Sequence, residues 1–222
     1  MNPAQLALDL IQPLTPTLEN FVPGRNAEAL ASLRALKAGE GPQFIYLWGE
    51  AGAGCSHLLR ALGGTGLLAG KSGGGVPEFD PRHSLYCVDE VQSLDAEAQS
   101  RLFILMNEVR AHPGARLAAA GDAPPAQLEE RGMRDDVSSR LAWGLVYQIH
   151  SLSDVEKAQA LVAHASSRGV VLTPEVRAWM LAHLPRDMRT LVAVLDALDA
   201  YALVRKRPIT VPLLREWLAH TR

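Results

Sequence analysis

The chain has 222 residues, of which 48% are hydrophobic and 21% are charged, and its formal net charge is −2. This composition is ordinary for a globular protein with a substantial core, and the length predicts a core domain with a smaller second domain. A near-neutral net charge gives no sign of the strongly basic composition that is typical of proteins that bind DNA phosphates. We therefore expect no sequence-specific DNA binding.

The cysteines and the hydropathy pattern indicate where the protein works. Cys55 and Cys87 are the two cysteines, and the first residues do not form the basic-then-apolar pattern of a signal peptide. No apolar stretch approaches the roughly 18 residues that cross a bilayer. We expect a cytoplasmic protein that does not contact membranes.

In the first third of the chain, an extended tail precedes a helix, a strand and a glycine loop. Residues 1–20 contain three prolines and little periodicity, which predicts the tail. Residues 26–36 have apolar side chains at helical spacing, and residues 44–48 form a buried strand that runs into a glycine loop. A helix is expected over residues 56–62. Residues 63–75 then contain seven glycines, a composition typical of a flexible loop.

The middle of the chain repeats the order of strand and helix. Residues 84–88 are a short apolar run, residues 96–111 show a helical apolar face, and the alanine-rich residues 117–120 predict a further core strand. Alternating strands and helices predict an α/β fold with a parallel sheet that is covered on both faces.

The last third has only helical patterns. Residues 153–156 form a capping box, and Thr173 with Pro174 marks the start of a second helix. Residues 187–205 have one apolar stripe, and Thr210 can cap a last helix. We predict three parts: an extended tail over 1–20, a nucleotide-binding core over 21–150, and a small all-helical lid domain over 151–222.

Residues 49–56 match the spacing of a phosphate-binding P-loop, G-x-x-x-x-G-K-[S/T], except that cysteine stands where lysine should be. Glycines let backbone N–H groups turn toward phosphate, and the following helix offers its positive end. The alternative is a strand-to-helix turn that holds no ligand. The residues expected to line a nucleotide phosphate site are Gly49, Gly52, Gly54, Cys55, Ser56 and His57.

An acidic pair follows the next strand. Asp89 and Glu90 stand where P-loop proteins place the acid that holds magnesium, directly or through water. Taken alone, the pair also suits a solvated start of a helix. The order of P-loop and acidic strand end favours nucleotide binding, with a candidate Mg²⁺ site at Ser56 and Asp89.

Further motifs give the chain a resemblance to a family. Arg140 lies in S-S-R-L-A-W-G and Arg189 in D-M-R-T-L, and each arginine alone suits an ordinary surface role. Together with the P-loop, the acidic strand end, A-G-D-A-P-P and residues 19–26, these motifs resemble the AAA+ family of replication initiators related to DnaA. The resemblance implies that Asp122 is a sensor after the third strand, that Arg140 is an arginine finger acting on a neighbouring subunit, and that Arg189 is the lid arginine that faces the nucleotide.

The tail adds a second resemblance. Gln5, Leu8 and Leu10 lie in Q-L-A-L-D-L, which resembles the short peptide by which bacterial proteins dock on the DNA polymerase III sliding clamp (beta subunit). A chance match in a tail is the alternative. The resemblances imply a bacterial protein whose partners are the sliding clamp and DnaA, with a homodimer also possible and without the DNA-reading domain of a full initiator.

These resemblances imply a regulator of DNA replication initiation. It would dock on the clamp and stimulate hydrolysis of DnaA-bound ATP by supplying Arg140, which prevents re-initiation. Because Cys55 replaces the lysine, we predict no autonomous ATPase and a bound ADP in preference to ATP. An ATP-driven helicase loader or remodeller and a nucleotide-free scaffold are the alternatives.

Overall fold

The computed structural model describes residues 15–64, 75–185 and 187–220. It contains two compact units, Pro16–Ser151 and Leu152–Arg222, which we call the core and the lid. The tail motif with Gln5, Leu8 and Leu10 lies outside the described residues, so clamp docking stays a prediction.

The core contains a parallel sheet of four strands among the described residues, in the order β2-β3-β1-β4. In the register of the sheet, Tyr46 of β1 pairs with Ala119 of β3 and with Val146 of β4. The parallel α/β prediction is confirmed. The strands are β1 (Phe44–Trp48), β2 (Leu85–Val88), β3 (Arg116–Gly121) and β4 (Leu145–Gln148).

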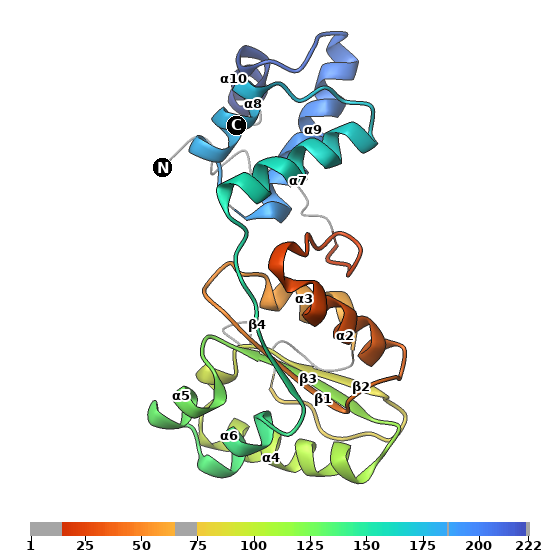
Figure 1. The fold of residues 1–222 in the computed structure, drawn as a ribbon, viewed down its shortest axis with the longest axis vertical. Coiled ribbons are helices and arrows are strands. Elements are labelled where there is room, and N and C mark those ends of the chain that lie inside the picture. Colours follow the sequence, from red (N-terminus) through yellow and green to blue (C-terminus); the bar gives the residue numbers. More distant parts are fainter. Residues whose placement is uncertain (1–14, 65–74, 186, 221–222) are drawn as a thin grey trace. The chain divides into compact units, whose positions relative to one another are not determined.

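Helices cover both faces of this sheet. In Figure 1, α2 and α3 lie on one face, and α4, α5 and α6 lie on the other. Short 3₁₀ turns at Gly24–Asn26 and Val91–Ser93 precede α2 and α4. The helices are α2 (Ala27–Lys37), α3 (Cys55–Leu62), α4 (Ala96–Ala111), α5 (Pro125–Glu130) and α6 (Asp135–Leu141).

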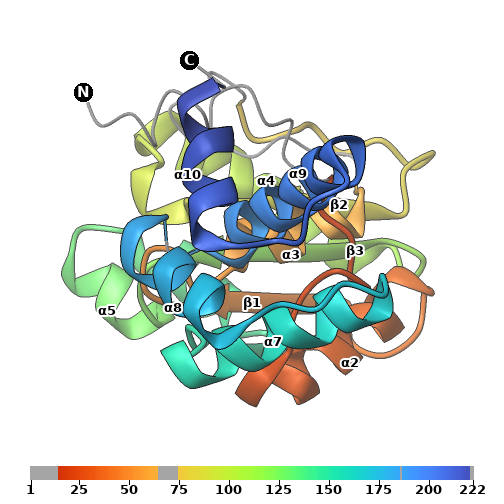
Figure 2. The same ribbon diagram turned by 90° about the horizontal axis from the view of Figure 1, so that it is seen from above.

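Strand β1 separates two apolar cores. Because side chains alternate along a strand, Phe44 and Tyr46 pack with α4 and α6, whereas Ile45 and Leu47 pack with α2 and α3. Strand β3 runs beside β1 (Figure 2) and contributes small alanines to both cores. Both faces of β3 are buried after Arg116, which explains why the rest of the strand is apolar.

The lid is a separate helical unit with its own core. Ser153 and Glu156 form the predicted capping box, and the side chains of Thr173 and Asp187 cap the next two helices. These three predicted starts of helices are confirmed. None of the helices in the described ranges has both the length and the hydrophobicity that crossing a membrane requires. The helices are α7 (Asp154–Ser167), α8 (Pro174–His183), α9 (Met188–Arg205) and α10 (Val211–His220).

Candidate functional site

The glycine loop joins β1 to α3 and adopts a backbone that requires its glycines. Gly52 and Gly54 have φ values of +86° and +110°, in the left-handed region that side chains disfavour. A Cβ on Gly49 would collide with the Ile149 carbonyl oxygen. Gly54 caps α3 without a side-chain hydrogen bond, so the first amides of this helix have no capping side chain and a phosphate can accept from them.

Ser56 and His57 lie in the first turn of α3. The His57 Nε2 atom is 3.0 Å from the Thr17 carbonyl oxygen, and its ring centroid is 5.6 Å from that of Phe21. The Phe21 ring also lies against Gly54, where an added Cβ would be 2.8 Å from it. The segment before α2 therefore packs on the start of the phosphate loop helix, and the role of His57 in nucleotide binding stays a prediction.

Cys55 occupies the position of the P-loop lysine as a neutral group. Burial raises the pKa of its thiol to about 12, and the negative charge of Asp89 contributes in the same direction. At neutral pH the thiol is thus protonated and uncharged. The loop has two glycines with left-handed backbone and lacks a side-chain cation at the position of the lysine.

The acidic strand end lies near this thiol. Asp89 is buried, and its carboxylate accepts a hydrogen bond of 2.9 Å from the Glu90 amide. Glu90 has a φ of 51° and a ψ of 44°, a left-handed conformation that is rare for a side-chain-bearing residue. Such backbone strain is concentrated at functional sites, so it supports a functional role for this turn.

Tyr46 is a member of this site that the sequence patterns did not identify. Its hydroxyl donates a 2.7 Å hydrogen bond to the Ala123 carbonyl oxygen. Burial raises the pKa of Tyr46, and the negative charge of Asp122 adds to the effect. The residue therefore links β1, which runs into the glycine loop, to the segment after β3. A tyrosine within a buried strand resembles any core aromatic, so periodicity alone could not single it out.

Asp122, the expected sensor, follows β3 and forms a surface ion pair. Its carboxylate lies 3.1 Å from the Arg131 guanidinium, and both side chains are about half exposed. Pairs of this kind typically contribute about 0 to 1 kcal/mol, so Asp122 can exchange this partner for another at little cost.

The glycine loop and the start of α3 suit the inner phosphates of a nucleotide better than they suit a metal ion alone. Among the residues that the structure describes, no group of three or more His, Cys, Asp and Glu side chains could hold a metal ion. Mg²⁺ keeps several waters and binds one or two carboxylates together with phosphate oxygens. Magnesium at Ser56 and Asp89 would therefore depend on a phosphate for further ligands.

Arg140 lies in α6 and is half buried against the core. Its Nε donates to the Asn107 side-chain oxygen at 3.2 Å, and its Nη1 donates to the Asp136 carbonyl oxygen at 2.6 Å. The guanidinium carbon is 4.0 Å from the Phe103 ring centroid and 5.0 Å from that of Trp143. None of these contacts neutralises its charge.

Arg189 is exposed in the first turn of α9, within the lid. Because the core and the lid are described separately, a role of Arg189 at the phosphate loop stays a prediction. Asp89, Cys55, Asp122 and the phosphate loop, in contrast, all belong to the core.

A four-stranded parallel sheet with a glycine loop after β1, followed by a helical lid, is the fold of a AAA+ module. The similar solved structures support this class. Domain III of Thermotoga maritima DnaA is 22% identical with a TM-score of 0.65, and the match covers 95% of this chain and 99% of that chain. AMPPCP-bound DnaA from Aquifex aeolicus is 22% identical with a TM-score of 0.64, over 89% of this chain and 70% of that one. A mutant RuvB from Thermotoga maritima is 15% identical with a TM-score of 0.58, over 91% and 71%.

The sequence of the lid matches a named protein family. Residues 154–218 match the family described as Hda, lid domain. The chain therefore combines a core that has the fold of DnaA domain III with a C-terminal segment that matches the Hda lid domain.

Proposed function

We propose that this protein is a regulatory inactivator of DnaA. Docked on the sliding clamp by its tail, it supplies Arg140 to the ATP held by DnaA and so speeds hydrolysis of that ATP. The match of residues 154–218 to the Hda lid carries the proposal, because a DnaA-inactivator role belongs with that lid.

The state of the phosphate loop supports a regulatory role. A P-loop lysine normally reaches the β- and γ-phosphates, whereas the Cys55 thiol is uncharged at neutral pH. The backbone cradle can still bind the inner phosphates, with ADP favoured over ATP. This nucleotide would stabilise the core, while the chemistry takes place on the nucleotide of the partner.

Arg140 has the properties that a trans-acting arginine requires. It is positively charged, is held in place by two hydrogen bonds, and forms no ion pair with any described residue. An arginine finger neutralises charge that develops on the transferring phosphoryl group and is worth about 10³ to 10⁵ in rate. Its removal should therefore lower the maximal rate of stimulated hydrolysis and leave assembly intact.

The test measures hydrolysis of DnaA-bound ATP with clamp loaded on DNA, for the wild-type protein and for Arg140→Ala. We expect Arg140→Ala to lose stimulation by at least about 10³-fold. Its melting temperature should fall by only about 2 to 4 °C, since the lost ring contacts are worth about 1 kcal/mol. Arg134→Ala is the matched control, because Arg134 is the same residue type, also faces Phe103, and is already paired with Asp136 at 2.6 Å.

Two further measurements separate this function from its rivals. Leu8→Ala with Leu10→Ala should abolish clamp binding and clamp-dependent stimulation while the lid and core stay folded, because each buried leucine contributes about 1.5 to 3 kcal/mol. Hydrolysis by the isolated protein at rates typical of an ATPase would instead identify a loader or remodeller. Full stimulation by a folded Arg140→Ala variant would refute the proposal.

A further inference from the structure

A second arginine stands beside Arg140 on the same indole ring. The Arg110 guanidinium carbon lies 4.4 Å from the Trp143 ring centroid, and that of Arg140 lies 5.0 Å from the same centroid. Phe44 meets the Trp143 ring edge-on, with centroids 5.5 Å apart. We call Arg110, Arg140 and Trp143 the arginine face.

The two arginines of this face have no anionic partner in the described part of the chain. Other arginines of the core do: Arg101 pairs with Glu97 at 2.5 Å, and Arg131 pairs with Asp122 at 3.1 Å. For Arg110 the structure gives the indole as its contact. An exposed cation–π contact is worth only about 0.5 to 1 kcal/mol. Two like charges beside one ring are therefore left for an external anion to neutralise.

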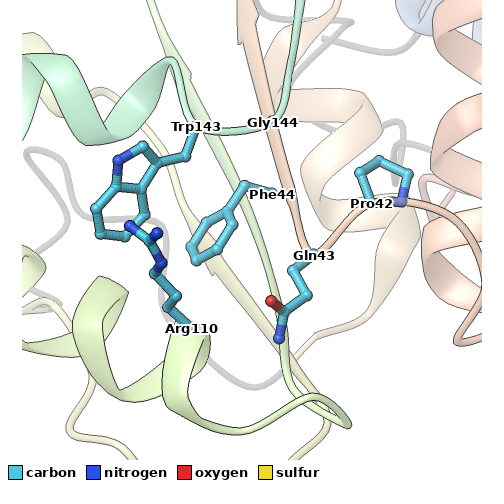
Figure 3. A pocket seen from close by; sticks show the side chains of 6 residues that line it. All are labelled: Pro42, Gln43, Phe44, Arg110, Trp143 and Gly144. Carbon is cyan, nitrogen blue, oxygen red and sulfur yellow. The ribbon is translucent and has the colours of Figure 1, made fainter.

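Arg110 also borders a hollow of about 290 Å³ at the end of the sheet where the strands begin. In Figure 3, the Arg110 side chain rises from α4 and lies over Trp143, with Phe44 beside both. A side chain at Gly144 would collide with the Phe44 carbonyl oxygen, so only glycine lets the backbone at residue 144 approach the backbone of β1 this closely. The hollow is lined by Pro42, Gln43, Phe44, Arg110, Trp143 and Gly144.

The polar groups around the hollow differ in how well they are satisfied. The Gln43 side-chain amide already donates to the carbonyl oxygens of Val109 and His112, each at 3.0 Å. The Arg110 guanidinium is exposed, and its N–H donors form no hydrogen bond to described residues in this structure. The hollow thus presents the Arg110 guanidinium, a planar cation, next to the apolar ring of Trp143.

We propose that the hollow is a docking site for an acidic side chain, aspartate or glutamate, with an adjoining apolar residue on the ATP-bearing partner. The proposal rests on the proposed function. A guanidinium binds a carboxylate through two parallel hydrogen bonds, and the part of the Trp143 side chain that lines the hollow offers apolar contact to the neighbouring side chain. Docking here would place the partner beside Arg140, because Arg110 and Arg140 contact the same ring.

A single strand of nucleic acid fits this face less well. Such strands bind by stacking their bases on open aromatic faces. Here Arg110 and Arg140 both lie within 5.0 Å of the Trp143 centroid, and Arg140 lies 4.0 Å from that of Phe103. Guanidinium groups therefore occupy the positions that bases would take.

The experiment titrates ATP-bound DnaA against a fixed amount of this protein on loaded clamp and follows hydrolysis. We expect Arg110→Ala to raise the DnaA concentration for half-maximal stimulation about 10-fold or more, with the maximal rate near that of wild type. Arg110→Lys keeps the charge and loses the bidentate geometry, so it should give an intermediate value. Arg101→Ala is the matched control, since nine residues at 100° per residue place Arg101 on the opposite side of the same helix.

Each alternative result has a separate meaning. Unchanged half-maximal concentration for a folded Arg110→Ala, with wild type active, overturns the docking site and leaves the proposed function standing. A lower maximal rate at unchanged concentration also overturns it, and assigns Arg110 to the positioning of Arg140. If Arg110→Ala instead alters self-association in sedimentation, the partner is a second copy and the proposal is wrong. Absence of stimulation by wild type refutes the proposed function itself.

Discussion

The two ends of the parallel sheet have opposite electrostatic character. At the end where the strands finish, the phosphate loop has the shape of an anion site, and Cys55 supplies a neutral thiol in place of a cation. At the end where the strands begin, Arg110 and Arg140 lie beside Trp143 as cations that the described residues leave without an anion. The first end has a neutral thiol where a lysine would supply a cation, and the second end has two arginines that pair with no described acid.

This contrast suits the regulatory role that we propose. A self-sufficient ATPase concentrates its cations around its own nucleotide. In this chain the loop backbone is retained, which suits a nucleotide that stabilises the fold by binding only the native state. Arg110 and Arg140, which pair with no acid among the described residues, are available to a partner, and in the proposed function nucleotide binding and phosphoryl chemistry are divided between two proteins.

The largest effect is expected from breaking the loop itself. Gly54→Ala places a Cβ 2.8 Å from the Phe21 ring at a φ of +110°. Left-handed strain costs about 1 to 2 kcal/mol and overpacking about 1 to 3 kcal/mol, so the free energy of unfolding of the core should fall by roughly 2 to 5 kcal/mol. Chemical denaturation measures the change.

Gly52→Ala is the matched control for this prediction. Its φ of +86° imposes similar strain, but no atom lies within 4 Å of the added Cβ. Gly52→Ala should therefore cost only the strain, about 1 to 2 kcal/mol. Equal costs for the two variants would show that Phe21 does not pack on the loop as described.

The second prediction concerns the lysine that Cys55 replaces. Cys55→Lys should tighten ATP binding by about 10- to 100-fold, because a charge-assisted hydrogen bond to phosphate is worth about 1.5 to 3 kcal/mol. The gain for ADP should be smaller, since the γ-phosphate lacks its side-chain partner in the natural chain. Calorimetry with each nucleotide measures both values, and Cys55→Ser serves as the neutral control. If the lysine improves neither nucleotide, the loop is not a phosphate site.

The sequence predicted the fold well where one physical cause dominates. Capping by Ser153 and Thr173 is local, so a short motif was enough to place two helices of the lid, whereas the apolar stripe over 187–205 placed a third. The alternation of β1 between two cores likewise follows from the period of a strand.

The candidate site was predicted only in part, because its electrostatics depend on distant residues. Cys55 was found from its motif, but its raised pKa results from burial and from Asp89, which is 34 positions away. Asn107 and Phe103 hold Arg140 from another helix, and no spacing rule links them to it. Tertiary contacts of this kind are invisible to a pattern read along the chain.

The smallest effect separates strain from function at the acidic strand end. Glu90 and Lys206 are the non-glycine residues with positive φ in the described chain, and their angles are almost the same: φ 51° with ψ 44°, and φ 51° with ψ 42°. Asparagine tolerates this conformation far better than glutamate or lysine and, unlike glycine, adds little freedom to the unfolded state. We expect Glu90→Asn and Lys206→Asn each to stabilise its own unit by about 0.5 to 1 kcal/mol.

Nucleotide binding then distinguishes the two positions. Lys206 ends a helix in the lid, whereas Glu90 follows the buried Asp89, whose carboxylate accepts from the Glu90 amide. If the strained turn serves the phosphate site, Glu90→Asn should weaken the magnesium dependence of ADP binding about 3- to 10-fold, while Lys206→Asn leaves it unchanged. That loss, together with a gain in stability, is the pattern of a residue whose strain is tolerated for function. If both variants are more stable than the natural chain and bind ADP with the same magnesium dependence, the left-handed turn at Glu90 has no role in nucleotide binding. Glu90 would then not belong to the site.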